Sequence, residues 1–305
     1  MATLLGDIEF LNSWPVTYAL RLRLVDGEVK IISGTPAQLN QKLLTGELDC
    51  SAVSSMLFLR HLEELVPIPE LCIRSDGGVH SVLVVSRQPL EKLRGKTVGV
   101  SNQGATTPVL LKILLAHRGL KMNLQVTPLR YPEILQEFPA ALLIGDEALV
   151  AAQDSALWLR LPEGAAPGAS ALLTWDLGEA WTSWTKLPAV FALWVMRRKL
   201  ANEQPRLLGE IGDTLRESLE WGKSHREELI GQMRKIFPLE ATFLRRYLSD
   251  LSYDLNEKAW AGLRRFAREA ERIGESPRGT EKQLSRLEPW KTSVKYSRKL
   301  STANA

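Results

Sequence analysis

The chain has 305 residues, of which 45% are hydrophobic and 24% charged, and its formal net charge is +4. This length is enough for two lobes with substantial cores, and the composition is that of a globular protein. The N-terminus lacks a basic segment followed by an apolar run, and no apolar run approaches the roughly 18 residues of a membrane helix. Its two cysteines, Cys50 and Cys72, have no CxxC spacing and predict neither a disulfide framework nor a metal site. We therefore expect a cytoplasmic protein without a signal peptide or a membrane span.

Most of the positive charge lies at the C-terminal end. The segment from Ser276 to Ala305 holds seven basic and two acidic residues, which leaves the rest of the chain nearly neutral. A basic extension of this kind is usually solvated and partly disordered, and a nucleic-acid-binding arm is the less favoured interpretation. No zinc spacing, aromatic RNA-binding signature or basic helix occurs elsewhere in the sequence, so we expect no nucleic-acid partner. No pattern predicts an oligomeric state.

The opening stretch GDIEFLNSWP, residues 6–15, predicts a strand followed by a helix. Its apolar residues alternate, as in a half-buried strand, and Pro15 suits the first position of a helix. The strand therefore ends at Asn12, whose amide can both donate and accept hydrogen bonds. Trp14 either walls a ligand site or packs in the core, and the sequence alone leaves both open.

Strands and helices continue to alternate along the first two thirds of the chain. Thr35 and Gly46 are typical of the two ends of a helix, and the strand LDCSAVSS leads into a helix that begins near Met56. The run GVHSVLVVS, residues 78–86, is the most β-branched in the chain and predicts a central strand. Two further strand–helix units follow, and the last predicted strand is AVFALWVM, residues 189–196. Beyond it the pattern is mostly helical.

This alternation predicts an α/β fold with largely parallel sheets, and two successive series of strands predict two lobes. The chain is expected to cross between them twice. Lobe one is then predicted to comprise residues 1–86 and 189–275, and lobe two residues 87–188. Residues 276–305 form a basic tail that is expected to be disordered. Two lobes joined twice are typical of a protein that closes by hinge motion on a ligand in the cleft between them.

Three predicted loops share one design, because AVSSM, NQGATTP and LIGDEAL each leave a strand and enter a helix through small or hydroxyl residues. The N-terminus of a helix carries free N–H groups and a partial positive charge, which suits a carboxylate or phosphate. Ligands of open α/β sheets bind at these strand ends. A helix cap is the plainer explanation for any single loop. For Asp146 we favour the cap. For Ser55, and for Thr106 and Thr107 together, a helix cap and a ligand contact are equally favoured.

Other catalytic motifs are absent from the sequence. There is no Walker P-loop, GxGxxG, GxSxG or HExxH motif, so nucleotide, hydrolase and metalloenzyme functions are not indicated. His80 and Ser81 begin the β-branched strand and point to opposite faces, so only one of them can face a cleft. Trp181 and Trp184, one helical turn apart, are more typical of a core than of a ligand wall. Thr185 leads into the predicted return crossing and is a candidate cleft residue.

Five of these stretches together resemble a known family. GDIEFLNSWP, GELDCSAVSS, GGVHSVLVVS, ALLIGDEAL and DLGEAWTSWTKLPAVFALW occur in the order and spacing of the menaquinone-biosynthesis family of the futalosine pathway, from about Gly6 to Ile273. The chain is most similar to the chorismate dehydratase branch of that family. The resemblance implies a type II periplasmic-binding-protein-like pair of lobes with a ligand cleft. It also implies the dehydration of chorismate to 3-[(1-carboxyvinyl)oxy]benzoate without a cofactor or a metal.

The resemblance further implies roles for individual residues. The amide of the first motif falls on Asn12 and the serine after the GGV turn falls on Ser81, and we expect these two to be catalytic. The substrate contacts expected from the loops and the resemblance together are Ser55, Met56, Thr106, Thr107, Gly145, Asp146 and Thr185. Two departures from the family pattern occur. Lys186 and Ala189 stand where the family usually has glycine and an aromatic residue, and Thr107 replaces a serine.

The implied chemistry suits this set of residues. Chorismate is a dianion, and loss of its C3 proton and C4 hydroxyl produces an aromatic ring, so the reaction is strongly downhill. The signature positions supply no Asp, Glu or His as a base. We therefore expect the enolpyruvyl carboxylate of the substrate to take the proton, while Asn12 and Ser81 orient the reacting groups and stabilise charge.

Two alternatives remain open at the level of the sequence. One is the sister enzyme that makes 1,4-dihydroxy-6-naphthoate, which uses a histidine in lobe two, where His117 is the candidate here. The other is a non-catalytic protein that binds a small carboxylate.

Overall fold

The computed structural model describes residues 2–101, 104–158 and 172–287. Its strands are β1 (Thr3–Asp7), β2 (Val29–Ser33), β3 (Cys50–Ser54), β4 (Leu65–Ser75), β5 (Val82–Ser86), β6 (Thr97–Ser101), β7 (Asn123–Thr127), β8 (Ala140–Ile144), β9 (Leu173–Asp176), β10 (Ala189–Arg197) and β11 (Leu251–Ser252). Its helices are α1 (Trp14–Arg21), α2 (Pro36–Thr45), α3 (Ser55–Arg60), α4 (Thr106–His117), α5 (Ile134–Glu137), α6 (Asp146–Trp158), α7 (Leu177–Thr185), α8 (Arg198–Glu203), α9 (Pro205–Ser224), α10 (Arg226–Ile236), α11 (Ala241–Asp250), α12 (Glu257–Arg272) and α13 (Thr280–Ser285). A 3-10 turn spans Leu90–Leu93.

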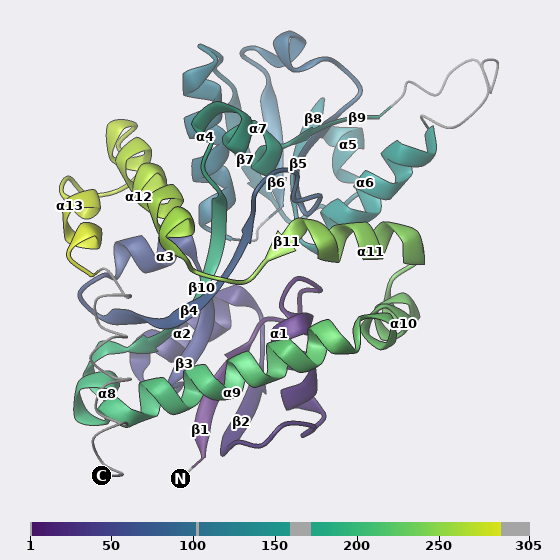
Figure 1. Cartoon of the computed structure of the whole chain (residues 1–305). Helices are drawn as coiled ribbons and strands as arrows, with labels where there is room; N and C mark the ends of the chain where they lie inside the picture. Colours follow the sequence, from purple (N-terminus) through teal and green to yellow (C-terminus); the bar gives the residue numbers. More distant parts are fainter. Residues whose placement is uncertain (1, 102–103, 159–171, 288–305) are drawn as a thin grey trace, which may run out of the picture.

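These elements form the two α/β lobes that the alternating pattern predicts (Figure 1). Lobe one is built on a six-stranded sheet of order β11-β4-β10-β3-β1-β2, and lobe two on a five-stranded sheet of order β7-β6-β8-β5-β9. Each sheet has a parallel part, formed by β1, β2 and β3 in lobe one and by β6, β7 and β8 in lobe two. The remaining strands pair antiparallel, so both sheets are mixed rather than largely parallel.

The first crossing between the lobes comes earlier in the chain than predicted. Strand β5 pairs with β8 and β9, so residues 82–86 belong to lobe two, and the chain crosses between Ser75 and Val82. The β-branched composition of this run marks a buried strand, but its partners come later in the chain and no local pattern shows which sheet it joins. The return strand β10 begins at Ala189 and lies between β3 and β4 in lobe one.

The segment predicted to be a disordered tail is in part a packed helix. Helix α13 contacts α12 and α3, and its Leu284 is fully buried. Glu281 of the same helix pairs with Arg268 of α12 at 2.6 Å. The many basic residues favoured disorder, but the buried Leu284, the ion pair of Glu281 and two backbone N–H bonds to Glu271 of α12 hold this turn of helix against lobe one. Residues 288–305 of the predicted tail lie outside the described residues.

Local signals in the sequence account for the ends of several helices. Thr35 and Gln38 form a capping box at the start of α2, and Gly46 ends it in the left-handed region at φ 90°. Pro15 lies within the first two positions of α1, where its missing N–H is not needed. Trp14 is buried and stacks on Tyr18, so it packs in the core rather than walling the cleft.

Helix α9 lies very close to α1. A Cβ atom built on Gly222 of α9 would lie 2.2 Å from the carbonyl oxygen of Pro15, so only glycine allows this approach. Helix α12 makes a similar contact with the return crossing, because a Cβ on Gly262 would lie 2.3 Å from the carbonyl oxygen of Pro188. In the described part of the chain, no helix is long and apolar enough to cross a membrane.

Candidate functional site

A cleft of about 630 Å³ lies between the two lobes. Lobe one contributes the loop after β1, the end of β3 and the start of α2, and lobe two contributes the residues around the ends of β6 and β8. Of the nine residues predicted to form the site, five line this cleft: Asn12, Ser81, Thr106, Thr107 and Gly145. Carboxyl ends of neighbouring strands meet at one edge of a sheet, and for this reason loops far apart in the sequence converge here.

The first strand ends at Asp7 and not at Asn12 as predicted, so Asn12 lies in the loop between β1 and α1. Hydrogen bonds within this loop and one from Tyr253 hold its backbone. The hydroxyl of Ser13 donates to the carbonyl oxygens of Ile8, at 2.7 Å, and of Phe10, at 2.8 Å. The carbonyl oxygen of Asn12 accepts a hydrogen bond from the Tyr253 hydroxyl at 2.9 Å. These bonds fix the backbone and leave the Asn12 side chain on the wall of the cleft.

Ser81 follows a turn that is anchored by an aspartate. One carboxylate oxygen of Asp176 accepts from the backbone N–H of Val79, at 2.9 Å, and of His80, at 2.7 Å. The His80 ring turns away from the cleft and lies 2.8 Å from the carboxylate of Asp250. Ser81, which is 2% exposed, lines the cleft, so the expected opposition of these two neighbours is confirmed.

The start of α4 carries the most suitable site for an anion. Among the described residues no side chain caps this helix, whose N-cap residue is Ala105. The first N–H groups of a helix have no partner within the helix, and here they lie at a wall formed by Thr106 and Thr107. The Thr106 hydroxyl also accepts the backbone N–H of Met56 at 2.8 Å, which joins the two lobes beside the cleft. Ser101, just before this loop, is 1% exposed and lines the same wall, and its hydroxyl has no hydrogen-bond partner among the described residues.

Ser55 and Met56 do not line the cleft, contrary to expectation. Ser55 is buried and its hydroxyl donates to the carbonyl oxygen of Val190 at 2.7 Å, and the Met56 side chain is also buried. Ser54 lines the cleft instead, and it caps α3 by accepting the N–H of Leu57 at 3.4 Å. The prediction of Ser55 is thus wrong by one residue. Strand β3 continues to Ser54, and because side chains alternate between the two faces of a strand, that of Ser54 faces the cleft.

Asp146 and Thr185 also lie outside the cleft lining. Asp146 is 8% exposed, and its carboxylate oxygen Oδ1 accepts the backbone N–H of Leu11, in lobe one, at 3.0 Å. The predicted N-cap is thus wrong, since α6 already begins at Asp146 and this bond of its carboxyl crosses to the other lobe. Burial raises the pKa of this carboxyl to about 7. The Thr185 hydroxyl donates to the Trp181 carbonyl within α7 at 2.8 Å.

Six polar residues that line the cleft are not among the predicted site residues: Ser13, Thr35, Asn40, Ser54, Ser101 and Arg130. Arg130 is the one charged side chain among the described residues that line the cleft, and it lies 3.5 Å from Glu147. It follows β7, whose loop does not enter a helix directly, so it lies outside the strand–helix loops that predict the other contacts. Asn40 is one of several polar residues of the amphipathic helix α2, and no motif distinguishes it from the others. Nowhere in residues 2–101, 104–158 and 172–287 do three or more His, Cys, Asp or Glu gather in a way that could hold a metal.

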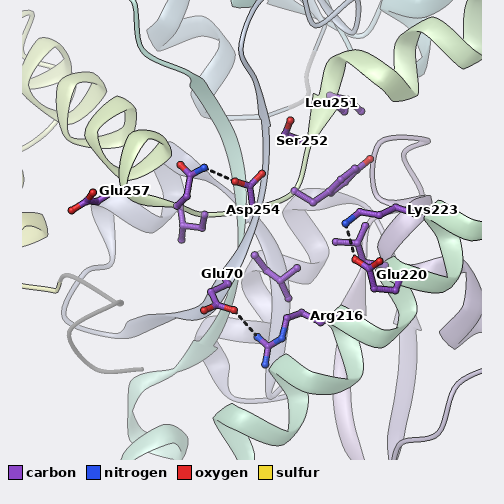
Figure 2. Close-up of a pocket in the computed structure, with 13 residues that line it drawn as sticks. Glu70, Arg216, Glu220, Lys223, Leu251, Ser252, Asp254 and Glu257 are labelled. Atoms are coloured by element: carbon purple, nitrogen blue, oxygen red, sulfur yellow. Dashed lines mark hydrogen bonds and ion pairs between the residues drawn. The ribbon is translucent and has the colours of Figure 1, made fainter. Parts of the chain in front are cut away.

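A second hollow, of about 860 Å³, lies on lobe one between α9, β4 and the segment that leads into α12 (Figure 2). Figure 2 shows two pairs of oppositely charged side chains facing each other: Glu70 lies 3.8 Å from Arg216, and Glu220 lies 2.7 Å from Lys223. None of the predicted site residues lines it. We call it the lobe-one groove and place the candidate site in the cleft, where the predicted residues converge.

Comparison with known proteins identifies the family of the chain. The family model for menaquinone biosynthesis matches residues 3–272. This chain belongs to the menaquinone-biosynthesis family. A relative, the chorismate dehydratase of Thermus thermophilus, is 32% identical over 275 residues, which cover 86% of this chain and 93% of that protein. The family resemblance inferred from the five motifs is confirmed.

Solved structures place this member of the menaquinone-biosynthesis family among periplasmic-binding-protein-like folds. A protein from Archaeoglobus fulgidus superposes with a TM-score of 0.71 at 21% identity, covering 89% of this chain and 97% of that one. The periplasmic aliphatic sulphonate binding protein of Escherichia coli superposes with a TM-score of 0.65 at 15% identity, covering 93% of this chain and 91% of that one. Identities this low show the fold alone, and they confirm the predicted pair of lobes.

Proposed function

We propose that this member of the menaquinone-biosynthesis family is a chorismate dehydratase, which converts chorismate to 3-[(1-carboxyvinyl)oxy]benzoate and water. The observation that carries the proposal is the lining of the cleft. Asn12 and Ser81 face the cleft together, and its described lining includes one cation, Arg130, and no Asp, Glu, His or Lys. The relative from Thermus thermophilus named chorismate dehydratase supports the same reaction.

Two positive regions of the cleft suit the two carboxylates of chorismate. The start of α4, which no described side chain caps, offers backbone N–H groups and the hydroxyls of Thr106 and Thr107. The guanidinium of Arg130 offers paired N–H donors in the geometry that a carboxylate accepts. A dianion held between these groups would place its ring beside the neutral side chains of Asn12 and Ser81.

The elimination then needs no carboxylate from the protein. The enolpyruvyl carboxylate takes the proton from C3, and the electron pair of that C–H bond delocalises through the ring diene toward the ring carboxylate. The pair then returns to form the new ring double bond as the C4–O bond breaks. The departing hydroxyl recovers the proton and leaves as water, so atoms and charge balance and the ring becomes aromatic.

Asn12 and Ser81 suit the two charged stages of this path. Their neutral donors can stabilise charge as it develops on the substrate oxygens without repelling a dianion, as a fixed Asp or Glu would. Their backbones are tied to the rest of the protein, Asn12 by Tyr253 and Ser81 by the turn that Asp176 anchors. Such preorganised groups need little rearrangement as the reaction proceeds.

The position of His117 disfavours the naphthoate-forming sister enzyme. His117 lies in the last turn of α4, its ring stacks on that of Trp184 with centroids 3.9 Å apart, and it does not line the cleft. A histidine that acts on substrate must reach the reacting atoms. We therefore prefer the dehydratase.

Separate Asn12→Ala and Ser81→Ala variants test the proposal. Each should lower kcat for chorismate by on the order of 10²-fold or more, as loss of one preorganised donor does in other active sites. Product is followed by absorbance and mass spectrometry, with the exposed Asn202→Ala as a matched control that keeps wild-type kcat. Near-normal turnover by both site variants would overturn the roles assigned to these residues. Binding of chorismate by the wild type without product would favour a non-catalytic binding protein.

A further inference from the structure

The turn between β8 and α6 holds the backbones of both candidate catalytic residues. The N–H of Gly145 donates to the carbonyl oxygen of Ser81 at 2.7 Å. The carboxylate of the next residue, Asp146, accepts the N–H of Leu11 at 3.0 Å, immediately before Asn12. Two consecutive residues therefore connect the Ser81 segment, in lobe two, to the Asn12 loop, in lobe one.

The approach of the two lobes at this turn depends on Gly145. Its φ is 71°, in the left-handed region, and a Cβ atom built on it would lie 3.1 Å from the Phe10 ring. A larger residue would push the Asn12 loop away from lobe two. The close packing brings the Asp146 carboxyl within reach of the Leu11 N–H.

The carboxyl of Asp146 is buried at an energetic cost. It is 8% exposed, and none of the ion pairs described for the structure gives it an arginine or lysine partner. Burying a carboxylate without a cation is unfavourable, and a buried carboxyl beside a cleft is more typical of function than of stability. Its described hydrogen bond is the one to the Leu11 N–H.

We infer that Asp146 is a positioning residue, which sets the placement of the Asn12 amide relative to Ser81 through its hydrogen bond to the Leu11 N–H when the lobes meet. This inference rests on the proposed chorismate dehydratase function. Asp146 itself does not line the cleft, so it acts through the loop and not on the substrate. Its loss should affect the rate of the chemical step more than the binding of substrate.

Variants of the full-length protein separate the hydrogen bond from the carboxyl charge. Asp146→Ala removes the acceptor, and kcat for chorismate should fall about 10- to 100-fold while KM changes less than about threefold, as for a misplaced catalytic group. Asp146→Asn keeps an oxygen that can accept the Leu11 N–H, and kcat should return to within about threefold of wild type. Asp146→Asn keeps the acceptor and should keep its stability, whereas Asp146→Ala leaves the buried Leu11 N–H without an acceptor and should be less stable than the wild type. Thermal unfolding verifies that both variants are folded at the assay temperature.

Gln153→Ala is the matched control. Gln153 lies on the same helix, α6, and also bridges the lobes, through the carbonyl oxygen of Pro238 at 3.0 Å and the N–H of Glu240 at 2.6 Å. It is remote from the Asn12 loop, so its variant should keep wild-type kcat. Equal losses in Asp146→Ala and Gln153→Ala, or no loss in Asp146→Ala, would overturn the inference, as would an Asp146→Asn variant as slow as Asp146→Ala. A wild-type protein that does not turn over chorismate would instead overturn the proposed function.

Discussion

The carboxyl of Asp146 titrates far from the range of an exposed aspartate. Burial raises its pKa to about 7 from the ordinary value of 3.8, and the N–H of Leu11 lowers it only in part. The Tyr247 hydroxyl faces it from α11, but burial holds the pKa of that group far above neutrality, so it stays uncharged. Glu147, the next residue, also has a raised pKa through its own burial. At neutral pH the folded protein thus holds protons that the unfolded chain has released.

The stability of the wild type should therefore depend on pH in a way that the stability of Asp146→Asn does not. A raised folded-state pKa contributes stability that is complete below about pH 4 and is lost as the pH rises through about 7. Relative to Asp146→Asn, the wild type should lose roughly 2–4 kcal/mol of unfolding free energy between pH 4 and pH 8. Urea unfolding of both proteins across this range measures the difference, in which the contribution of Glu147 cancels. Parallel curves would contradict the prediction.

Arg130 should govern affinity rather than rate. It is the cation of the described cleft lining, and a charge-assisted bond to a carboxylate contributes about 1.5–3 kcal/mol. We expect Arg130→Gln to raise KM for chorismate about 10-fold or more while kcat stays within about threefold. Arg94→Gln is the control, because Arg94 is an exposed residue of the same lobe whose guanidinium donates to the Gly119 carbonyl. An unchanged KM in Arg130→Gln would show that the substrate carboxylates bind elsewhere.

Among single residues, the sequence predicted those that belong to extended motifs and missed those that stand alone. Asn12 and Ser81 were predictable because each belongs to an extended stretch, Asn12 in the loop after β1 and Ser81 immediately before β5. A run of two serines does not show where the strand stops, so the sequence predicts Ser55 where the structure places Ser54. Arg130 gave no signal, because its place in the cleft depends on the path of the loop after β7.

Helix α9 shows how one glycine sets the distance between elements. We expect Gly222→Ala to destabilise the protein by about 1–3 kcal/mol, since its Cβ would meet the backbone of Pro15 and α1 must move. Gly209→Ala, on the same helix, meets nothing within 4 Å and should stabilise by about 0.5–1 kcal/mol through its helix propensity. Urea unfolding compares the two. Changes of the same sign would show that the close approach of α9 and α1 does not limit stability.

At the scale of elements, the helix ends were predictable and the strand partners were not. Thr35, Pro36 and Gly46 set the bounds of α2 through bonds within a few residues, so local sequence is sufficient. Lys186, noted as a departure from the family glycine, ends α7 with φ 59°, a conformation that glycine adopts more readily. The sheet to which β5 belongs depends on β8 and β9, which no pattern within β5 encodes.

The C-terminal helix contributes to the stability of the whole molecule. A chain that ends at Gly274 loses the buried Leu284 and the pair between Glu281 and Arg268. It also loses Glu275, which pairs with Lys112 of lobe two at 2.5 Å. We expect its Tm to fall by about 3–10 °C, from the burial of one leucine and the size of the protein. A chain that ends at Leu287 keeps all these contacts and serves as the control in thermal unfolding. Equal Tm values for the two chains would contradict the role assigned to α13.

At the scale of the molecule, the two lobes were predictable because strands and helices alternate in two series. The boundary between the lobes was harder to predict, because the segments that cross from one lobe to the other have no characteristic composition. The tail illustrates the same limit, since charge predicted disorder where Leu284 and Glu281 instead pack a helix onto α12. Burial of one side chain against a distant element is a property of the fold and not of the segment.

The place of β10 has a consequence for synthesis on the ribosome. This strand lies between β3 and β4 but follows all of lobe two in the chain. Lobe two is continuous in sequence and can assemble as soon as it emerges, whereas the sheet of lobe one must wait with the edges of β3 and β4 unpaired. Exposed strand edges invite pairing with other chains. The nascent protein is therefore most open to misassembly during the interval in which its second lobe is being made.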